Sequence, residues 1–173
     1  MQYAVESLRV TATARVIEVG CGAGYALAAL RAKHPTIELT GIDRSATQIV
    51  KARRLLSGLS PAIRPRLAQL TLAAAARRWH DTPFDWLLAI NVNTFWTEPG
   101  DAFVAASRLL RRRGKALLVY EPPTVAGLDI LSGKLHRAIV ASGWRVIDER
   151  RRESCVILTV QPNVESESPA DNR

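Results

Sequence analysis

Glu18-Val19-Gly20-Cys21-Gly22-Ala23-Gly24 is the stretch that decides the fold of this 173-residue chain. It closes the apolar run 15–19, and the next apolar run, 37–42, is closed by Asp43. Glycines let a backbone turn sharply and approach a ligand closely. An acid before such a turn, with a second acid at the end of the next strand, predicts a pocket for an adenosyl group at the carboxyl ends of a parallel sheet.

Strand-like and helix-like segments alternate along most of the chain, which is typical of a parallel sheet covered by helices. We expect parallel strands at 15–19, 37–42, 66–70, 84–90 and 115–120, and helices at 24–33, 45–57, 73–78, 101–113 and 129–142. Gly114 is expected to cap the fourth helix in a left-handed conformation. Only a short charged turn separates the last two strands, 144–148 and 154–160, so they should form an antiparallel hairpin. The predicted α/β fold is a doubly wound, seven-stranded, mostly parallel sheet with one antiparallel strand.

The chain is long enough to bury one core. We expect a lead-in segment at 1–14, one ligand-binding domain at 15–160, and a disordered tail at 161–173 because that segment is polar and contains two prolines. No apolar run approaches the ~20 residues that span a bilayer. No signal peptide is expected either, so we predict a cytoplasmic protein without membrane contact. Neither cysteine has a neighbour at metal-ligand spacing, so no metal is expected.

The formal charge of +8 hints at an anionic partner. The basic side is mostly arginine, in clusters at 53–54, 77–78, 111–113 and 150–152. We expect the second and third clusters at the sheet edge opposite the pocket, where cations complement helix C-termini. The last cluster should lie in the hairpin turn on the pocket side, as a solvated turn or as a contact for an anionic substrate. Clusters at both ends do not predict a continuous nucleic-acid track.

The glycine turn suits one adenosyl cofactor better than another. A dinucleotide fold places a third glycine at position 25 or 27, but this chain has Tyr25 and Leu27 there. Glu18 would also set a negative charge near a pyrophosphate. S-adenosylmethionine (SAM) carries a sulfonium and an ammonium instead of phosphates, so acids near the turn favour it. The expected cofactor is therefore SAM.

The motifs together resemble the class I SAM-dependent methyltransferase family across about residues 14 to 160. The segments that carry the resemblance are the glycine motif 16–24, the ribose motif Gly41-Ile42-Asp43-Arg44-Ser45, the fourth-strand motif 84–91, the turn 109–115 and the closing hairpin. The resemblance implies methyl transfer from SAM, with S-adenosylhomocysteine as the product. The implied cofactor-binding residues are Glu18, Gly20, Cys21, Gly22, Gly24, Asp43, Arg44, Leu70 and Asn91.

One departure from the family concerns the adenine end of the cofactor. Members often carry an acid just after the third strand, whereas this chain reads Gln69-Leu70-Thr71. Backbone amides and packing against Leu70 and Arg44 are the expected replacement. A non-catalytic SAM-binding module is therefore one alternative reading.

Loops after the fourth and fifth strands should face the transferred methyl group. Asn93, Phe95 and Trp96 are candidates for contacting the acceptor, although the two aromatic side chains could equally pack the loop onto the core. In related enzymes that methylate the exocyclic amines of bases, this loop reads (Asp/Asn)-Pro-Pro-aromatic. Here Val92 and Asn93 stand in place of the two prolines, so methylation of the adenine amino group is not favoured. Alignment of donor and acceptor can supply much of the rate, so a base is optional.

The candidate catalytic residues are Asn91, Tyr120 and Glu121, and for Glu121 a helix cap is the alternative. We predict a methyltransferase that acts on a small molecule, with nucleic acid as a less favoured partner. An RNA or protein methyltransferase that works with a partner is the other alternative.

Overall fold

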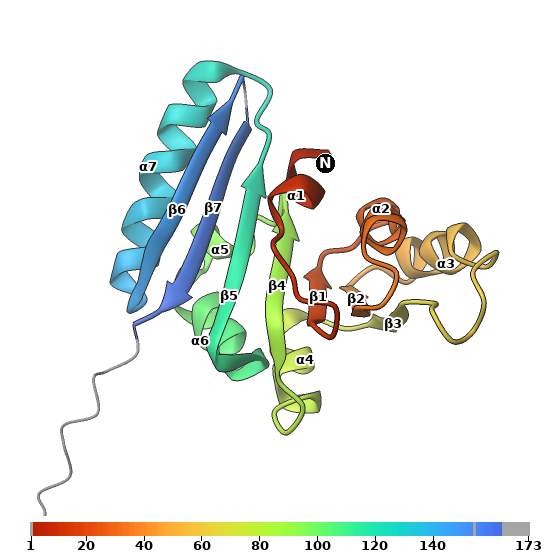
Figure 1. The fold of residues 1–173 in the computed structure, drawn as a ribbon. Helices are drawn as coiled ribbons and strands as arrows, with labels where there is room; N and C mark the ends of the chain where they lie inside the picture. The colour runs from red at the N-terminus through yellow and green to blue at the C-terminus, as the bar shows by residue number, and fades with distance from the viewer. Residues whose placement is uncertain (1, 154, 164–173) are drawn as a thin grey trace, which may run out of the picture.

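The structure, a computed structural model, describes residues 2–153 and 155–163. Its centre is a seven-stranded sheet in the order β3-β2-β1-β4-β5-β7-β6 (Figure 1). The strands are β1 (Arg15–Val19), β2 (Glu38–Asp43), β3 (Arg66–Gln69), β4 (Phe84–Ile90), β5 (Leu110–Tyr120), β6 (Trp144–Arg152) and β7 (Cys155–Pro162). β7 pairs antiparallel with both of its neighbours, and the other pairings are parallel. The predicted fold class is confirmed.

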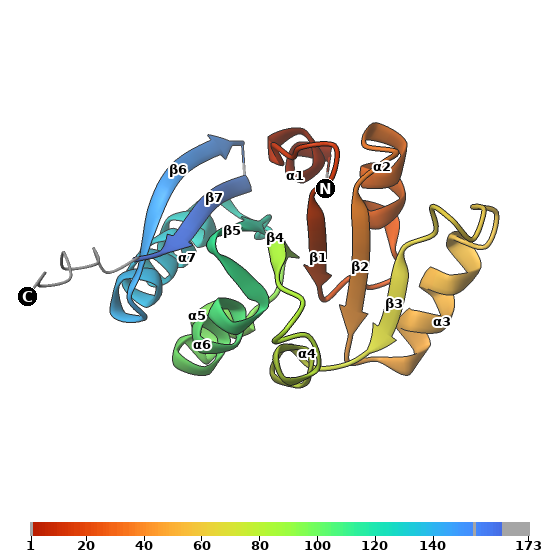
Figure 2. The ribbon, with the colours of Figure 1, turned by 60° about the horizontal axis from the view of Figure 1, so that its bottom comes forward.

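Helices cover both faces of the sheet (Figures 1 and 2). They are α1 (Gln2–Ser7), α2 (Tyr25–Lys33), α3 (Ala46–Leu55), α4 (Leu72–Arg78), α5 (Thr94–Thr97), α6 (Pro99–Leu109) and α7 (Val125–Ala141). The buried side chains form two clusters, one joining α1, α2 and α3 to the sheet and the other joining α4 to α7 to it. Strands between two such layers are buried on both faces, which explains why the second half of β5 is continuously apolar.

The helix before β5 ends four residues earlier than predicted. α6 ends at Leu109, and Leu110 already pairs with Phe84 on β4. Gly114 does not cap the helix, since the glycines with positive φ are Gly20, Gly22, Gly24 and Gly143. The helix prediction failed because pairing with β4 competes successfully for residues 110–113, whose side chains also suit a helix.

α7 starts at Val125, earlier than the predicted residue 129. Thr124 is the cap, and its hydroxyl accepts a hydrogen bond from the Gly127 N–H at 3.1 Å. The alternative of a cap at Glu121 is therefore wrong. A threonine side chain at this position satisfies one of the free N–H groups of the first helical turn.

The C-terminal hairpin is longer than predicted. β6 continues to Arg152, so the arginines at 150–152 lie in a strand, and β7 continues to Pro162, inside the segment predicted as tail. Ser154 and residues 164–173 lie outside the described residues. Within the lead-in segment, α1 packs against α2. None of the described helices has the length and apolar character needed to cross a membrane.

Candidate functional site

A cavity of about 710 Å³ lies at the carboxyl ends of the central strands. β1 lies between β2 and β4 in the sheet, so the strand order reverses beside it. Ligands of doubly wound sheets bind at this reversal point. Residues from the ends of β1, β2 and β4 line the cavity, together with the segments that lead into α4 and α6: Val19, Gly20, Asp43, Arg44, Leu70, Thr71, Ile90, Asn91, Asn93, Glu98 and Asp101 among them.

The glycine turn presents its backbone to this cavity. Gly20, Gly22 and Gly24 have φ values of 68°, 52° and 85°, which side chains other than glycine rarely adopt. A Cβ atom at Gly20 would also come within 2.8 Å of the Val92 Cγ2 atom. Of the turn residues predicted to bind cofactor, Gly20 lines the cavity, whereas Cys21, Gly22 and Gly24 are not among its lining residues.

Asp43 holds the glycine turn in place. Its Oδ2 atom accepts a hydrogen bond from the Gly22 N–H at 3.0 Å, and its Oδ1 atom accepts one from the Ser45 N–H at 2.8 Å. Each carboxylate oxygen can accept a second bond. The carboxylate of Asp43 therefore positions the turn and still offers acceptors to a ligand in the cavity.

Glu18 is buried beneath the turn with only 3% of its surface exposed. Its Oε2 atom has no hydrogen-bond partner among the described residues. Burial, and secondly the charge of Asp43, raise the pKa of Glu18 to about 8. Burial, and then the charges of Glu18 and Asp43, likewise raise the pKa of Cys21 to about 12, so its thiol stays protonated at neutral pH. This corner of the site favours a ligand that brings positive charge.

The adenine side, as the resemblance defines it, is built from main-chain atoms and apolar side chains. The Leu70 N–H donates to the Asp43 carbonyl at 3.1 Å, and the Gln69 Nε2 atom donates to the Arg44 carbonyl at 3.4 Å. Arg44 and Leu70 both line the cavity, as their predicted roles require.

Two acids that sequence reasoning missed also line the cavity. Glu98 and Asp101 belong to the start of α6, which begins at Pro99 and packs against α4. Neither carboxylate has a hydrogen bond or ion pair within the described part of the chain. Pro99, favoured at the first helical position, was the available signal for this helix start.

Asn91 links the ends of β4 and β5. Its N–H donates to the Val119 carbonyl at 2.8 Å, and its side-chain Oδ1 atom accepts a bond from the Glu121 N–H at 2.9 Å. Its φ of 54° is tolerated by asparagine better than by most residues. Asn91 and Asn93 both line the cavity.

The remaining candidates lie outside the cavity lining. Phe95 is fully buried against the Phe103 ring, with centroids 5.3 Å apart, and the Lys134 ammonium lies 5.3 Å from the Trp96 ring. The Tyr120 hydroxyl donates to the Val92 carbonyl at 2.6 Å, and burial raises its pKa. These contacts fasten the segment after β4 to the core. Glu121 is exposed and does not line the cavity.

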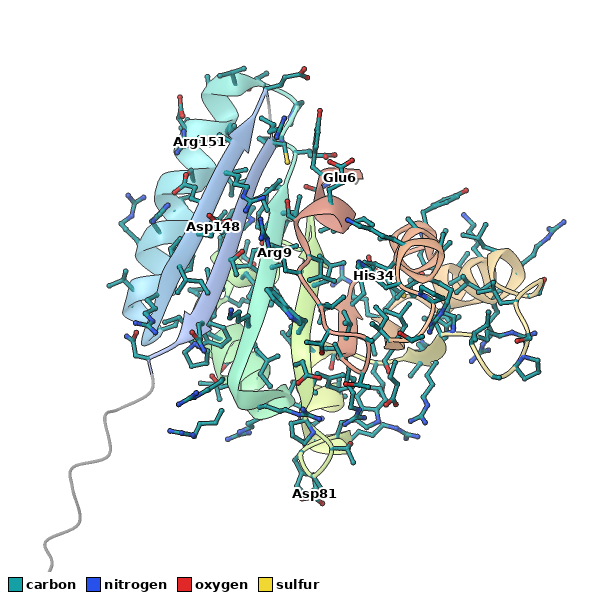
Figure 3. The ribbon with its side chains drawn as sticks, in the orientation of Figure 1. Glu6, Arg9, His34, Asp81, Asp148 and Arg151 are labelled. Atoms are coloured by element: carbon teal, nitrogen blue, oxygen red, sulfur yellow. The ribbon has the colours of Figure 1, made fainter. Side chains whose placement is uncertain are left out.

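The arginines of β6 are held by neighbouring side chains. Arg150 pairs with Asp148 at 2.9 Å, and Arg151 pairs with both Glu149 and Asp129 at 2.9 Å and 2.8 Å. Arg151 reaches from β6 toward α7 in Figure 3. None of these side chains lines the cavity.

The cavity is acidic although the whole chain is basic. Its ionisable lining residues are Asp43, Glu98 and Asp101 against one cation, Arg44. With these three carboxylates against one guanidinium, the site favours a cationic ligand over a phosphorylated one.

A family model described as a methyltransferase domain matches residues 17–116. The chain is also 31% identical over 126 residues to ribosomal RNA large subunit methyltransferase G of Aeromonas salmonicida, a match that spans 68% of this chain and 32% of that protein. The chain spans about a third of the length of the curated relatives that it matches.

Solved structures share the fold at low sequence identity. The [4+2]-cyclase SpnF has a TM-score of 0.77 at 16% identity, over 94% of this chain and 80% of that one. The glycopeptide N-methyltransferase MtfA, solved with SAM, has a TM-score of 0.72 at 16% identity, over 93% and 91% of the two chains. Because one neighbour is named as a cyclase, the fold alone does not define the reaction.

Proposed function

We propose that this chain transfers a methyl group from SAM to a small-molecule acceptor. The chain belongs to the methyltransferase domain family, in the class I SAM-dependent group, which supports the transfer of a methyl group from SAM. The observation that carries the proposal is the glycine turn that Asp43 fastens beside the acidic cavity. Family membership supports SAM as the cofactor, and the chemistry of the cavity supports it independently.

The residues present fit SAM. Glu18 is a buried carboxyl with an oxygen that lacks a partner among the described residues, and it suits a ligand that carries positive charge. Asp43 keeps free lone pairs, which suit the two hydroxyls of a ribose. Gly20, with no side chain, leaves the cavity wall open where a Cβ atom would meet Val92. We assign Gly20, Asp43, Arg44, Leu70 and Asn91 as direct contacts, and Glu18 and Gly22 as residues that support the turn.

The chain's own part in the reaction is binding and alignment. SAM supplies an electrophilic methyl group on a sulfonium, so the residues around it need to exclude water and hold the acceptor in line. Asn91 and Asn93 offer amide groups at the end of β4 to position an acceptor. Tyr120 is unsuited to act as a base because its hydroxyl is buried and already bonded to Val92. Among the described lining residues, Glu98 and Asp101 are the available acids for proton removal where the acceptor needs it.

A small molecule is the preferred acceptor because the cavity is concave and of the size that ligand pockets of proteins have, ~300–1,000 Å³. Its acidic lining opposes a phosphate backbone, and favours an acceptor that is neutral or cationic, such as an amine. Location in the cytoplasm remains a prediction.

Methylation of RNA is the second candidate. The relative from Aeromonas salmonicida is named as a ribosomal RNA methyltransferase, and the chain is basic overall. This candidate requires that RNA be bound outside the acidic cavity and that only the acceptor base enter it. Protein acceptors and a non-catalytic SAM-binding module stay as further alternatives.

Calorimetric titration with SAM and S-adenosylhomocysteine tests the proposal. Asp43→Ala should weaken SAM binding by about tenfold or more, because a charge-assisted pair of bonds contributes on the order of 1.4 kcal/mol or more. Asp81→Ala is the matched control, since Asp81 lies at the edge of the molecule (Figure 3), does not line the cavity and pairs with His80 at 2.9 Å. No binding of SAM by the wild-type chain at millimolar concentration would contradict the enzyme proposal. Equal affinity of the wild-type and Asp43→Ala chains would contradict the ribose assignment.

A further inference from the structure

A second cavity, of about 280 Å³, lies at the opposite end of the sheet. It is lined by Trp86 near the start of β4 and by Lys115, its partner on the parallel strand β5. The cofactor cavity instead begins at Ile90 and Asn91, where β4 ends. A ligand in the second cavity is therefore separated from the methyl-transfer site by the length of β4.

The lining of the second cavity is strongly cationic. It contains Arg9, Arg111, Arg113 and Lys115 against a single carboxylate, Asp85. Figure 3 shows Arg9, from the segment between α1 and β1, reaching over β5. Two segments that are about a hundred residues apart in the sequence thus bring their cations to one place.

Most of this positive charge has no counter-charge. Asp85 is already engaged by the Arg111 guanidinium at 2.8 Å and by the Arg15 N–H at 2.8 Å. The side chains of Arg9 and Arg113 have no hydrogen bond, ion pair or ring contact within residues 2–153 and 155–163. Lys115 lies 5.6 Å from the Trp86 ring centroid and has no anionic partner there. The cavity thus has an excess of three positive charges.

The backbone of β5 is shaped to present these arginines. Phe84 pairs with Leu110 and Trp86 pairs with Lys115, so four residues of β5, 111–114, stand opposite Asp85 alone. Such a bulge displaces side chains from the regular ladder. Gly114 makes the bulge compact, because a Cβ atom there would lie 2.9 Å from the Leu110 Cβ and 3.0 Å from the Arg111 carbonyl oxygen.

We propose that this second cavity binds a phosphate group, with Arg9 and Arg113 as its ligands and Lys115 as a supporting charge. A guanidinium group binds two phosphate oxygens through two parallel hydrogen bonds. Unpaired arginines that share a cavity also repel each other, and a bound anion offsets this repulsion. The phosphate is either part of an RNA backbone or part of a free phosphorylated molecule. The proposal uses no residue of the cofactor cavity and does not depend on methyl transfer.

The test compares two double variants that remove the same charge. Arg9→Gln with Arg113→Gln empties the proposed site, and Arg53→Gln with Arg54→Gln removes two exposed arginines of α3 that also lack partners among the described residues. Binding of a fluorescent short single-stranded RNA is measured by anisotropy over a range of NaCl concentrations, and binding of pyrophosphate by calorimetry.

We expect the site variant to bind the favoured probe at least about tenfold more weakly, which is a loss of about 1.4 kcal/mol or more, because two charge-assisted contacts to the phosphate are removed. For RNA, the slope of log K against log salt should also fall by about 1.4, at roughly 0.7 for each lost phosphate contact. The control variant should stay within about twofold of the wild-type protein, because Arg53 and Arg54 lie on α3 and do not line this cavity, and salt screens the charges of separated exposed residues.

Each outcome decides a point. A loss of RNA affinity in the site variant alone assigns the phosphate to an RNA backbone. A loss of pyrophosphate affinity with unchanged RNA binding assigns it to a free phosphorylated molecule. Equal losses in the two variants, or no binding of either probe by the wild-type protein, overturn the proposal. Thermal unfolding and SAM titration of both variants show that the fold and the cofactor site remain intact, which separates this test from that of the proposed function.

Discussion

Glu18→Gln should change how the stability of the protein depends on pH. The folded state holds a proton on Glu18 up to a pKa of about 8, whereas the unfolded chain releases it above the ordinary value of 4.5. Between these two values the unfolded state binds fewer protons, so the free energy of unfolding falls as the pH rises. Glutamine has nearly the same shape and does not titrate, so the variant lacks this contribution.

The expected size of the effect follows from the same two pKa values. The slope approaches about 1.4 kcal/mol per pH unit, which sums to about 3 kcal/mol between pH 5 and pH 8. This is a large share of a typical stability of ~5–15 kcal/mol. Between pH 5 and pH 8, the free energy of unfolding of the variant should therefore rise by about 3 kcal/mol relative to that of the wild-type protein.

Urea unfolding at several pH values, followed by tryptophan fluorescence, measures the difference. Saturating SAM should flatten the wild-type curve if its positive charge favours the ionised form of Glu18, and should leave the curve of the variant unchanged in shape. Parallel curves for the two proteins without ligand would refute the reasoning, because they would mean that Glu18 titrates alike in both states.

Four further substitutions test the geometry of the site. Gly20→Ala should lower both thermal stability and SAM affinity, because its Cβ would meet Val92, whereas Gly22→Ala should cost only the ~1–2 kcal/mol of a left-handed alanine, since nothing lies within 4 Å of its Cβ; similar melting temperatures for the two would contradict this difference. Asn91→Ala should lower stability by ~1–2 kcal/mol in denaturant unfolding, through the lost bond to the Glu121 N–H and the positive φ; an unchanged midpoint would show that this bond is dispensable. Tyr120→Phe should lower stability by about 1 kcal/mol and keep methyl transfer once an acceptor is known; loss of turnover at unchanged stability would instead make Tyr120 a catalytic residue.

Local signals predicted most of the fold. The strands and the helices α2 and α3 followed from apolar runs, caps and glycines, and the order of the motifs predicted the sheet. The errors came where two structures compete for the same residues. Residues 110–113 suit a helix, but pairing with Phe84 draws them into β5. At α7, Thr124 and Glu121 both offer a cap, and only the backbone geometry distinguishes them.

The site was predictable where one segment forms it and unpredictable where separate elements meet. Gly20 and Asp43 belong to motifs that the sequence shows, and both line the cavity. Glu98 and Asp101 line it because α6 packs against α4, which no local pattern indicates. Phe95 was predicted to contact the acceptor because it is an aromatic residue next to the site. The sequence does not show that its ring packs against Phe103 in the core.

The two cavities carry opposite charge, and this separation constrains any RNA acceptor. Asp43, Glu98 and Asp101 repel a phosphate backbone at one end of β4, whereas Arg9 and Arg113 attract it at the other. The seven residues of β4 span about 23 Å at ~3.3 Å per residue. A stacked strand that rises ~3.4 Å per nucleotide therefore needs at least about seven nucleotides to occupy both cavities, because it must pass around the buried strand. If RNA is the acceptor, methyl transfer should rise steeply near that length and lose this dependence when Arg9 and Arg113 are replaced. A small-molecule acceptor predicts methyl transfer that is indifferent to both changes.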